Sequence, residues 1–158
     1  MNESLVLDLG CGPRKAPGSI GLDAYPFDGV DIVRDLRRGL PFGDSTVDGI
    51  HMKHALEHFA GEDLLFLVEE MWRVSKPGAH WHIEVPDATS PNRYRDPLHL
   101  TRDWSEDSFL LWEVDAQGVW PIFVGPSYRR CAKLRRGGTY VTDSQQRNRV
   151  YELEVVKP

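Results

Sequence analysis

The sequence predicts an α/β fold, a Rossmann-like sheet flanked by helices. Short apolar runs alternate along the chain with turn residues and with two amphipathic helical patterns, which is the order of strands joined by helices. A chain of 158 residues, 41% of them hydrophobic, has the length of one domain and enough apolar side chains to fill one core. We therefore expect residues 1–158 to form a single domain.

Four short strands are expected in the first third of the chain. Each is an apolar run that stops at Gly, Asp or another turn-forming residue, as strands bounded by turns do. The expected strands cover residues 5–9, 19–23, 31–34 and 47–52.

Two helices and three more strands are expected in the rest of the chain. Apolar side chains recur at helical spacing over residues 64–75, and the turn Lys76-Pro77-Gly78 ends that helix. A second helix is expected over residues 106–116. The expected strands cover residues 80–85, 122–124 and 151–156.

Composition and charge exclude several classes of protein. No run approaches the ~18 apolar residues of a membrane span, and the first residues lack the basic and apolar regions of a signal peptide. We therefore expect a soluble, cytoplasmic protein with no membrane partner. The net charge of −5 argues against nucleic acid as a partner. Cys11 and Cys131 are too few for a disulfide framework and are expected to be reduced thiols.

The C-terminal part of the chain is basic. Residues 121–158 carry eight Lys and Arg residues against three acidic ones. Such a cluster is typical of a solvated strand edge or loop. The alternative is a site for a small anionic partner at this end of the chain.

A glycine-rich turn follows the first expected strand. Gly10 and Gly12 flank Cys11, and glycines there allow a sharp turn and let backbone N–H groups approach a ligand. Lys15 stands where a dinucleotide fingerprint needs its third glycine, so a pyrophosphate is not expected. Asp23 ends the second strand, where a carboxylate can accept hydrogen bonds from both hydroxyls of a ribose; the alternative for Asp23 is a turn former.

These residues resemble the class I S-adenosylmethionine-dependent methyltransferases, in particular small members with a Val-Leu-Asp-Leu-Gly-Cys-Gly opening. The likeness runs from Leu5 to Phe109, and five motifs come in the family's order. They are Val6–Gly12, Gly21–Asp23, Asp35–Leu36 with Leu40–Asp48, His54–Phe59, and Arg73–Gly78.

The resemblance implies a class I methyltransferase sheet and S-adenosylmethionine as cofactor. It implies that the chain is an enzyme that transfers a methyl group to an acceptor that the sequence does not identify. The family's third glycine would fall at Arg14, and only residues 13–18 separate Gly12 from the second strand, so helix A is expected to be shortened or missing. Pro13 and Pro17 agree, because each would break so short a helix. The residues implied for cofactor binding are Asp8, Gly10, Cys11, Gly12, Asp23, Ala24, Asp35, Leu36 and Lys53.

The candidate catalytic residues are His99 and His54. His99 lies in the long loop Pro86–Asp103, which follows the fifth strand and is expected to overhang the methyl-donor pocket. Its Asp96-Pro97-Leu98-His99 segment is similar to one that the family often shows there. His99 would take the acceptor's proton, or else pin the loop by hydrogen bonds. His80 and His82 are expected to be solvated or hydrogen-bonded rather than ligands.

Two other functions stay open at this point. A non-catalytic S-adenosylmethionine-binding module is the first alternative, because helix A is lost. The second is a zinc hydrolase, because His54, Glu57 and His58 have the H-x-x-E-H spacing in which two histidines share a helix face. We expect no metal, since the family match explains the same residues.

The methyl acceptor is expected to be a small molecule or a sugar- or nucleotide-like compound. Such an acceptor could face the aromatic and arginine side chains after the fifth strand, although aromatic residues at this spacing are also typical of a core. The sequence does not indicate the oligomeric state. These side chains are Tyr94, Trp104, Trp112, Trp120, Arg93 and Arg95.

Overall fold

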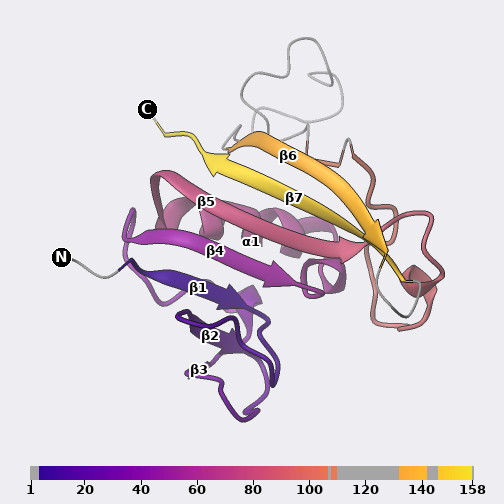
Figure 1. Ribbon diagram of the computed structural model, residues 1–158. Helices are drawn as coiled ribbons and strands as arrows, with labels where there is room; N and C mark the ends of the chain where they lie inside the picture. Colours follow the sequence, from indigo (N-terminus) through magenta and orange to yellow (C-terminus); the bar gives the residue numbers. More distant parts are fainter. Residues whose placement is uncertain (1–3, 107, 110–131, 142–145, 158) are drawn as a thin grey trace.

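The chain forms one seven-stranded sheet in the computed structural model, which describes residues 4–106, 108–109, 132–141 and 146–157 (Figure 1). The strand order is β3-β2-β1-β4-β5-β7-β6. The strands are β1 (Val6–Leu9), β2 (Ile20–Asp23), β3 (Ile32–Val33), β4 (Val47–Lys53), β5 (Ser75–Pro86), β6 (Ala132–Val141) and β7 (Arg147–Val155).

The direction of the strands brings the expected site residues to one edge. Strands β1 to β5 pair in parallel, and β7 runs antiparallel between β5 and β6. In Figure 1 the arrowheads of β1, β4 and β5 therefore point the same way. The strand order reverses between β1 and β4, and such a switch point is where open α/β sheets bind ligands.

Most of the expected strands are confirmed. The strand expected over 80–85 begins at Ser75 instead, because Ser75 pairs with Val47 ahead of a register shift. The strand β6 was not expected, and it forms the edge of the sheet within the basic stretch. The expected strand 122–124 lies outside the described residues, as does most of the helix expected over 106–116.

One α-helix lies in the described part of the chain, α1 (Gly61–Val74), and it lies against one face of the sheet (Figure 1). Its apolar stripe follows the predicted spacing. Leu67, Val68, Met71 and Val74 are buried in one core cluster with side chains of the central strands. On those strands the buried residues alternate with polar ones, so the helix covers the apolar face of the sheet.

The polar face of the sheet carries the histidines of β4 and β5. The rings of His51 and His82 stack with centroids 4.8 Å apart. Both His80 Nε2 and His82 Nδ1 lie 2.7 Å from the carboxylate oxygens of Glu152 on β7. This confirms the expectation that His80 and His82 are hydrogen-bonded side chains.

Helix A is missing, as expected. Residues 10–19 are all described and form turns between β1 and β2. The amide of Ala16 donates to Asp8 Oδ2 at 2.7 Å, and the Ser19 hydroxyl donates to the Ala16 carbonyl. The turns are therefore fixed by hydrogen bonds to β1 where a longer chain would form a helix.

Short 3₁₀ helices complete the described structure. They are η1 (Leu36–Arg38), η2 (Leu56–His58) and η3 (Pro91–Tyr94). No described helix has the length and apolar character needed to cross a membrane.

Three basic residues of the C-terminal stretch bind side chains of earlier segments of the chain. Arg149 Nη2 lies 2.6 Å from Asp87 Oδ2, which anchors the start of the loop after β5. The ammonium group of Lys157 donates to the Ser45 hydroxyl at 2.9 Å, and Arg147 donates to Thr89. These residues are part of the packing of the fold.

Candidate active site

Two pockets open side by side at the carboxyl edge of the parallel strands, and both are lined by Gly10, Gly12 and His54. The first, which we call the Glu84 pocket, has a volume of about 600 Å³. The second, the Asp23 pocket, has a volume of about 550 Å³. The nine residues expected to bind the cofactor all line one pocket or both. Asp8, Cys11 and Lys53 line the Glu84 pocket, and Asp23, Ala24, Asp35 and Leu36 line the Asp23 pocket.

The glycine turn after β1 separates the two pockets. Gly10 has φ +68°, and a Cβ on it would lie 2.5 Å from the Cβ of Ala55. Gly12 has φ +52°, and its amide donates to Asp23 Oδ2 at 2.9 Å. Any larger residue at position 10 would therefore push the turn away from the start of η2.

The carboxylate of Asp23 is held by two backbone amides. Gly12 donates to Oδ2, and Tyr25 donates to Oδ1 at 2.9 Å. An ionised carboxylate has about four lone-pair positions, so Asp23 keeps acceptor capacity beyond these two bonds. Its orientation is set before a ligand arrives.

Asp35 lines the same pocket from the start of η1. It is the N-cap of that helix, and its Oδ1 accepts a hydrogen bond from the Arg37 amide at 3.0 Å. Leu98 and Leu100, from the loop after β5, line the pocket from another side. The loop was expected to overhang the methyl-donor pocket, and two of its leucines line the Asp23 pocket; that this pocket holds the methyl donor stays a prediction.

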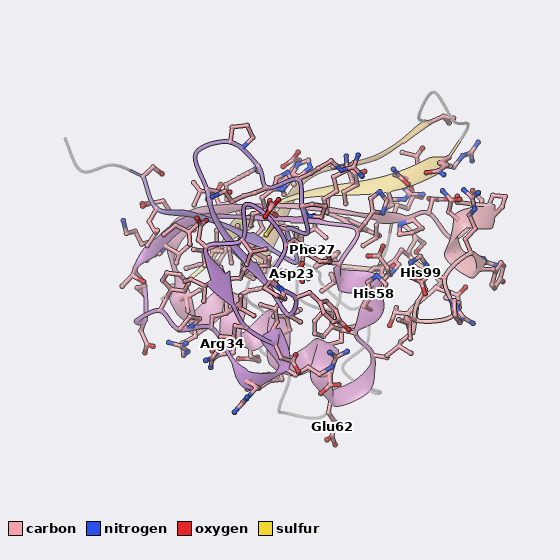
Figure 2. All side chains as sticks on the ribbon, turned by 90° about the horizontal axis from the view of Figure 1, so that it is seen from below. Asp23, Phe27, Arg34, His58, Glu62 and His99 are labelled. Carbon is pink, nitrogen blue, oxygen red and sulfur yellow. The ribbon has the colours of Figure 1, made fainter. Side chains whose placement is uncertain are left out.

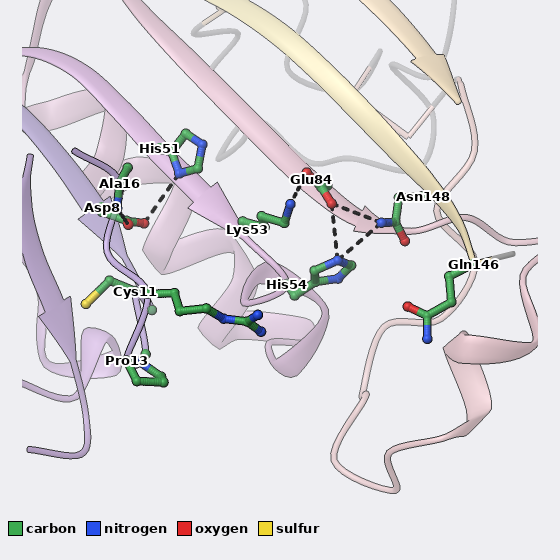
Figure 3. A pocket seen from close by; sticks show the side chains of 13 residues that line it. Asp8, Cys11, Pro13, Ala16, His51, Lys53, His54, Glu84, Gln146 and Asn148 are labelled. Carbon is green, nitrogen blue, oxygen red and sulfur yellow. Dashed lines mark hydrogen bonds and ion pairs between the residues drawn. The ribbon is translucent and has the colours of Figure 1, made fainter. Parts of the chain in front are cut away.

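A buried carboxylate lies at the centre of the Glu84 pocket (Figure 3). Glu84 is 4% exposed, and its oxygens lie 3.2 Å from Lys53 Nζ and 3.2 Å from His54 Nε2. The amide nitrogen of Asn148 on β7 donates to Glu84 Oε1 at 2.9 Å. One acid, two cationic side chains and an amide thus form a connected polar network on the ends of β4, β5 and β7.

His54 bridges two carboxylates. Its Nδ1 lies 3.4 Å from Glu57 Oε1 and its Nε2 faces Glu84. Burial on its own lowers the pKa of His54, but the nearby carboxylates of Glu57 and Glu84 outweigh it and raise the pKa to about 9. His54 is therefore an imidazolium near neutral pH, which donates hydrogen bonds rather than accepting a proton.

Asp8 and Cys11 both line the Glu84 pocket, but their surroundings give them different properties. The carboxylate of Asp8 accepts from Ala16 and lies 3.5 Å from His51 Nδ1, so it joins β1, β4 and the turn (Figure 3). Burial raises the pKa of the Cys11 thiol to about 11, with further contributions from Asp8 and Asp23. Cys11 is thus a protonated thiol and not a nucleophile.

The H-x-x-E-H segment does not have the geometry of a zinc hydrolase. His54 has φ +52° and precedes η2, which is a 3₁₀ helix of three residues. His54 and His58 therefore do not share the face of an α-helix, as that motif requires. His58 instead lies beside His99 from the loop, with ring centroids 4.9 Å apart (Figure 2). His99 lines a third, smaller cavity and neither of the two larger pockets.

Sequence reasoning missed Glu84 and Asn148. The signal for Glu84 was present, since His80, His82 and Glu84 alternate along β5 and share its polar face. Asn148 had no local signal, because its place depends on β7 inserting beside β5. Of the expected aromatic residues, Trp104 belongs to the core, Tyr94 is exposed, and Trp112 and Trp120 lie outside the described residues.

Comparison with known proteins agrees with this geometry. A family model described as a methyltransferase domain matches residues 23–83. Three solved structures are similar to the chain over two thirds or more of its residues. An S-adenosylmethionine-dependent methyltransferase from Methanosarcina mazei has a TM-score of 0.66 at 15% identity, over 100% of this chain and 95% of that one.

The other two structures differ in coverage. An S-adenosylmethionine-dependent methyltransferase from Archaeoglobus fulgidus is 26% identical with a TM-score of 0.55, over 67% of this chain and 57% of that one. The third is the 1,6-didemethyltoxoflavin-N1-methyltransferase of Burkholderia thailandensis, solved with 1,6-didemethyltoxoflavin and S-adenosylhomocysteine bound. It has a TM-score of 0.67 at 11% identity, over 99% of this chain and 72% of that one. No curated protein matches the sequence.

The chain has the class I methyltransferase fold. In this methyltransferase fold, the segment matched by the family model includes Asp23, Asp35 and His54, which all line the Asp23 pocket. The glycine turn precedes the matched segment. The turn and the matched segment meet at the hydrogen bond from Gly12 to Asp23.

Proposed function

We propose that the chain is an S-adenosylmethionine-dependent methyltransferase, with the adenosine part of the cofactor in the Asp23 pocket, its methionine end at the wall that the two pockets share, and the acceptor in the Glu84 pocket. The observation that carries the proposal is that the two pockets meet at Gly10, Gly12 and His54. A ligand that reaches past the glycine turn would present one end to each pocket. Methyl transfer requires that donor and acceptor meet in this way.

The residues of the Asp23 pocket fit an adenosine. We propose that Asp23 accepts hydrogen bonds from the two ribose hydroxyls with the acceptor positions that Gly12 and Tyr25 leave open. Asp35 would accept from the exocyclic amino group of the adenine, and Leu36 and Ala24 would contact the ring and ribose. The space beside Gly12, where a Cβ would meet no atom within 4 Å, leaves room for the ligand against the backbone.

The residues near the shared wall fit the methionine part of the cofactor. This part carries an ammonium and a carboxylate group, and Asp8 and Lys53 offer the opposite charges from the ends of β1 and β4. Gly10 and Cys11 line the wall between them. We assign these four residues to the methionine end of the cofactor.

S-adenosylmethionine supplies an electrophilic methyl group on a sulfonium, which carries the difficult chemistry. The chain's own residues would orient the acceptor and exclude water. His54, as a cation fixed by Glu57 and Glu84, would position a polar group of the acceptor by donating a hydrogen bond. The sequence-based role of His99 as proton acceptor stays a prediction.

The acceptor is proposed to be a small polar molecule, including sugar- or nucleotide-like compounds. Glu84, His54 and Asn148 offer hydrogen-bond donors and acceptors within a pocket of about 600 Å³. A pocket of that volume suits a small molecule. We assign the reaction to residues 1–158 acting as one domain.

The first test of the proposal is calorimetry with S-adenosylmethionine and S-adenosylhomocysteine, which we expect to bind in the micromolar range. The second is incubation of the protein with methyl-labelled cofactor and a fractionated small-molecule extract. Label in a new compound would identify the acceptor. Tight binding without turnover in any fraction would favour a non-catalytic module, and the absence of binding would contradict the proposal.

A further inference from the structure

Three metal-ligating side chains meet under the loop that follows β5. Glu57 and His58 come from η2 and His99 from the loop, and one ligand atom of each lies within 4.8 Å of the others. Figure 2 shows the two histidines side by side. They are far apart in the sequence, and the amides of Leu100 and Thr101 bring them together by donating to the Glu57 carbonyl at 2.8 and 3.1 Å.

The carboxylate of Glu57 is buried without a hydrogen bond. Glu57 is 1% exposed, and neither of its side-chain oxygens accepts a hydrogen bond from any described residue. The imidazole nitrogens nearest to it are His54 Nδ1 at 3.4 Å and His99 Nε2 at 3.9 Å, both beyond ordinary hydrogen-bond length. A buried carboxylate is normally hydrogen-bonded, paired closely or bound to a metal ion.

His99 also has a buried polar atom without a hydrogen bond to any described residue. Its side chain is 12% exposed, and its buried Nδ1 has no hydrogen-bond partner among the described residues. Two groups of one cluster, a carboxylate and an imidazole, thus lack the hydrogen bonds that buried polar groups normally make.

His58 is oriented as a metal-binding histidine would be. Its Nδ1 lies 3.2 Å from the Leu98 carbonyl oxygen. When Nδ1 carries the proton and donates it to a backbone carbonyl, Nε2 keeps its lone pair, and this is the usual arrangement behind a ligating histidine. Leu98 belongs to the same loop as His99, so one segment orients one ligand and supplies another.

We propose that Glu57, His58 and His99 bind one divalent first-row transition-metal ion. Two imidazoles and one carboxylate form the ligand set of many catalytic zinc sites and of the facial triad that binds Fe²⁺. All three residues line a cavity of about 250 Å³, which leaves a coordination position open to a further ligand. His58 also lines the Asp23 pocket, so the ion would lie next to the proposed cofactor site.

This metal site differs from the zinc motif in the sequence. In the H-x-x-E-H pattern His54 would be a ligand, but its Nε2 faces Glu84 at 3.2 Å. His99 takes that place from the loop. The proposal thus makes His99 a ligand rather than the acceptor's base, and it does not depend on whether the chain transfers methyl groups.

The test uses the untagged full chain, freed of metal with a chelator and titrated with Zn²⁺ by calorimetry and with Co²⁺ by visible absorption. We expect one ion per chain and a d–d spectrum typical of nitrogen and oxygen ligands. His99→Asn and Glu57→Gln should each weaken binding by at least about tenfold, as loss of a metal-site partner typically does. Glu57→Gln changes a buried group. If the Glu57→Gln variant fails to fold, His58→Asn serves as a second ligand variant.

The matched control is His82→Asn. His82, with His80 and Glu152, forms a second cluster of two histidines and one carboxylate on the sheet, and its hydrogen bonds are satisfied. The His82→Asn variant should bind the ion as the parent does. No binding to the parent, or binding that is lost in His82→Asn and kept in His99→Asn, would overturn the proposal.

Discussion

The amide of Gly12 donates a hydrogen bond to Asp23 Oδ2 at 2.9 Å, which ties the glycine turn after β1 to the end of β2. In a fold without helix A, this bond and the one from Ala16 to Asp8 fix the turn that such a helix would otherwise hold. The same carboxylate is the proposed ribose acceptor. One side chain thus shapes the pocket and would bind the ribose in it.

Replacing Asp23 should weaken cofactor binding. Asp23→Ala removes two charge-assisted hydrogen bonds to the ribose, each typically worth about 1.5 to 3 kcal/mol, so affinity for S-adenosylhomocysteine should fall by at least about tenfold. Calorimetry measures the loss. Asp28→Ala, which removes an exposed carboxylate outside both pockets, is the control and should bind as the parent does. Equal affinity in the Asp23 and Asp28 variants would assign the ribose to another residue.

Asp35 should control recognition of the adenine. Asp35→Asn keeps the shape of the side chain but weakens it as an acceptor, so the variant should discriminate less between S-adenosylhomocysteine and its inosine analogue. Competition binding gives the ratio of the two affinities. Asp63→Asn is a matched control, because Asp63 also pairs with Arg37 but does not line the Asp23 pocket. If Asp35→Asn keeps the parent's ratio, the adenine contact lies elsewhere.

The loop after β5 should respond to the cofactor in one part only. The amides of Leu100 and Thr101 bond to Glu57, so we expect them to be protected from hydrogen exchange without ligand. No amide of residues 89–98 donates to η2 among the described hydrogen bonds, so these amides should gain protection when S-adenosylhomocysteine binds, as gating loops do. Exchange that is equal in both states across the segment would count against a lid.

Low pH should weaken the ion pair between Glu70 and Arg73 on α1, and with it the contact of α1 with the segment before β4. Arg73 donates to both oxygens of Glu70, and its hydrogen bonds lower the pKa of Glu70 below the usual 4.5, against the effect of burial. A carboxylate with a lowered folded-state pKa stabilises the fold above its unfolded pKa and loses that effect as the pH falls through the folded value. Glu70→Gln should therefore cost about 1 to 3 kcal/mol at pH 7 and less near pH 3.

Urea unfolding of parent and variant at several pH values measures this difference. Glu62→Gln, an exposed position in the first turn of α1, is the control for a loss of charge on the same helix. A cost for Glu70→Gln that stays constant from pH 7 to pH 3 would show that the ion pair with Arg73 does not contribute.

The glycine turn and the end of β2 could be predicted from the sequence, because their signals are local. Gly10, Gly12 and Asp23 lie at strand ends that hydropathy and turn residues define, and the structure places all three on the expected edge. The loss of helix A followed from Pro13 and Pro17 in a short connection. Each of these features depends on residues close together in the chain.

The rest of the site depends on contacts between distant segments. Asn148 reaches Glu84 because β7 runs antiparallel beside β5, and no short pattern predicts that pairing. The basic residues of β6 obscured an edge strand, since charge at an edge is compatible with a loop as well. The zinc-hydrolase alternative for His54 and His58 fails because η2 is only one 3₁₀ turn, too short to place both on one helix face. The contact of His58 with His99 is set by the loop.

A crystal structure of the chain with S-adenosylhomocysteine bound would test the proposed site directly. We expect the ribose hydroxyls on Asp23, the adenine beside Asp35 and Leu36, and the sulfur directed past Gly10 toward the Glu84 pocket. Electron density for the ligand in any other cavity, or a ribose that does not touch Asp23, would contradict the proposed site.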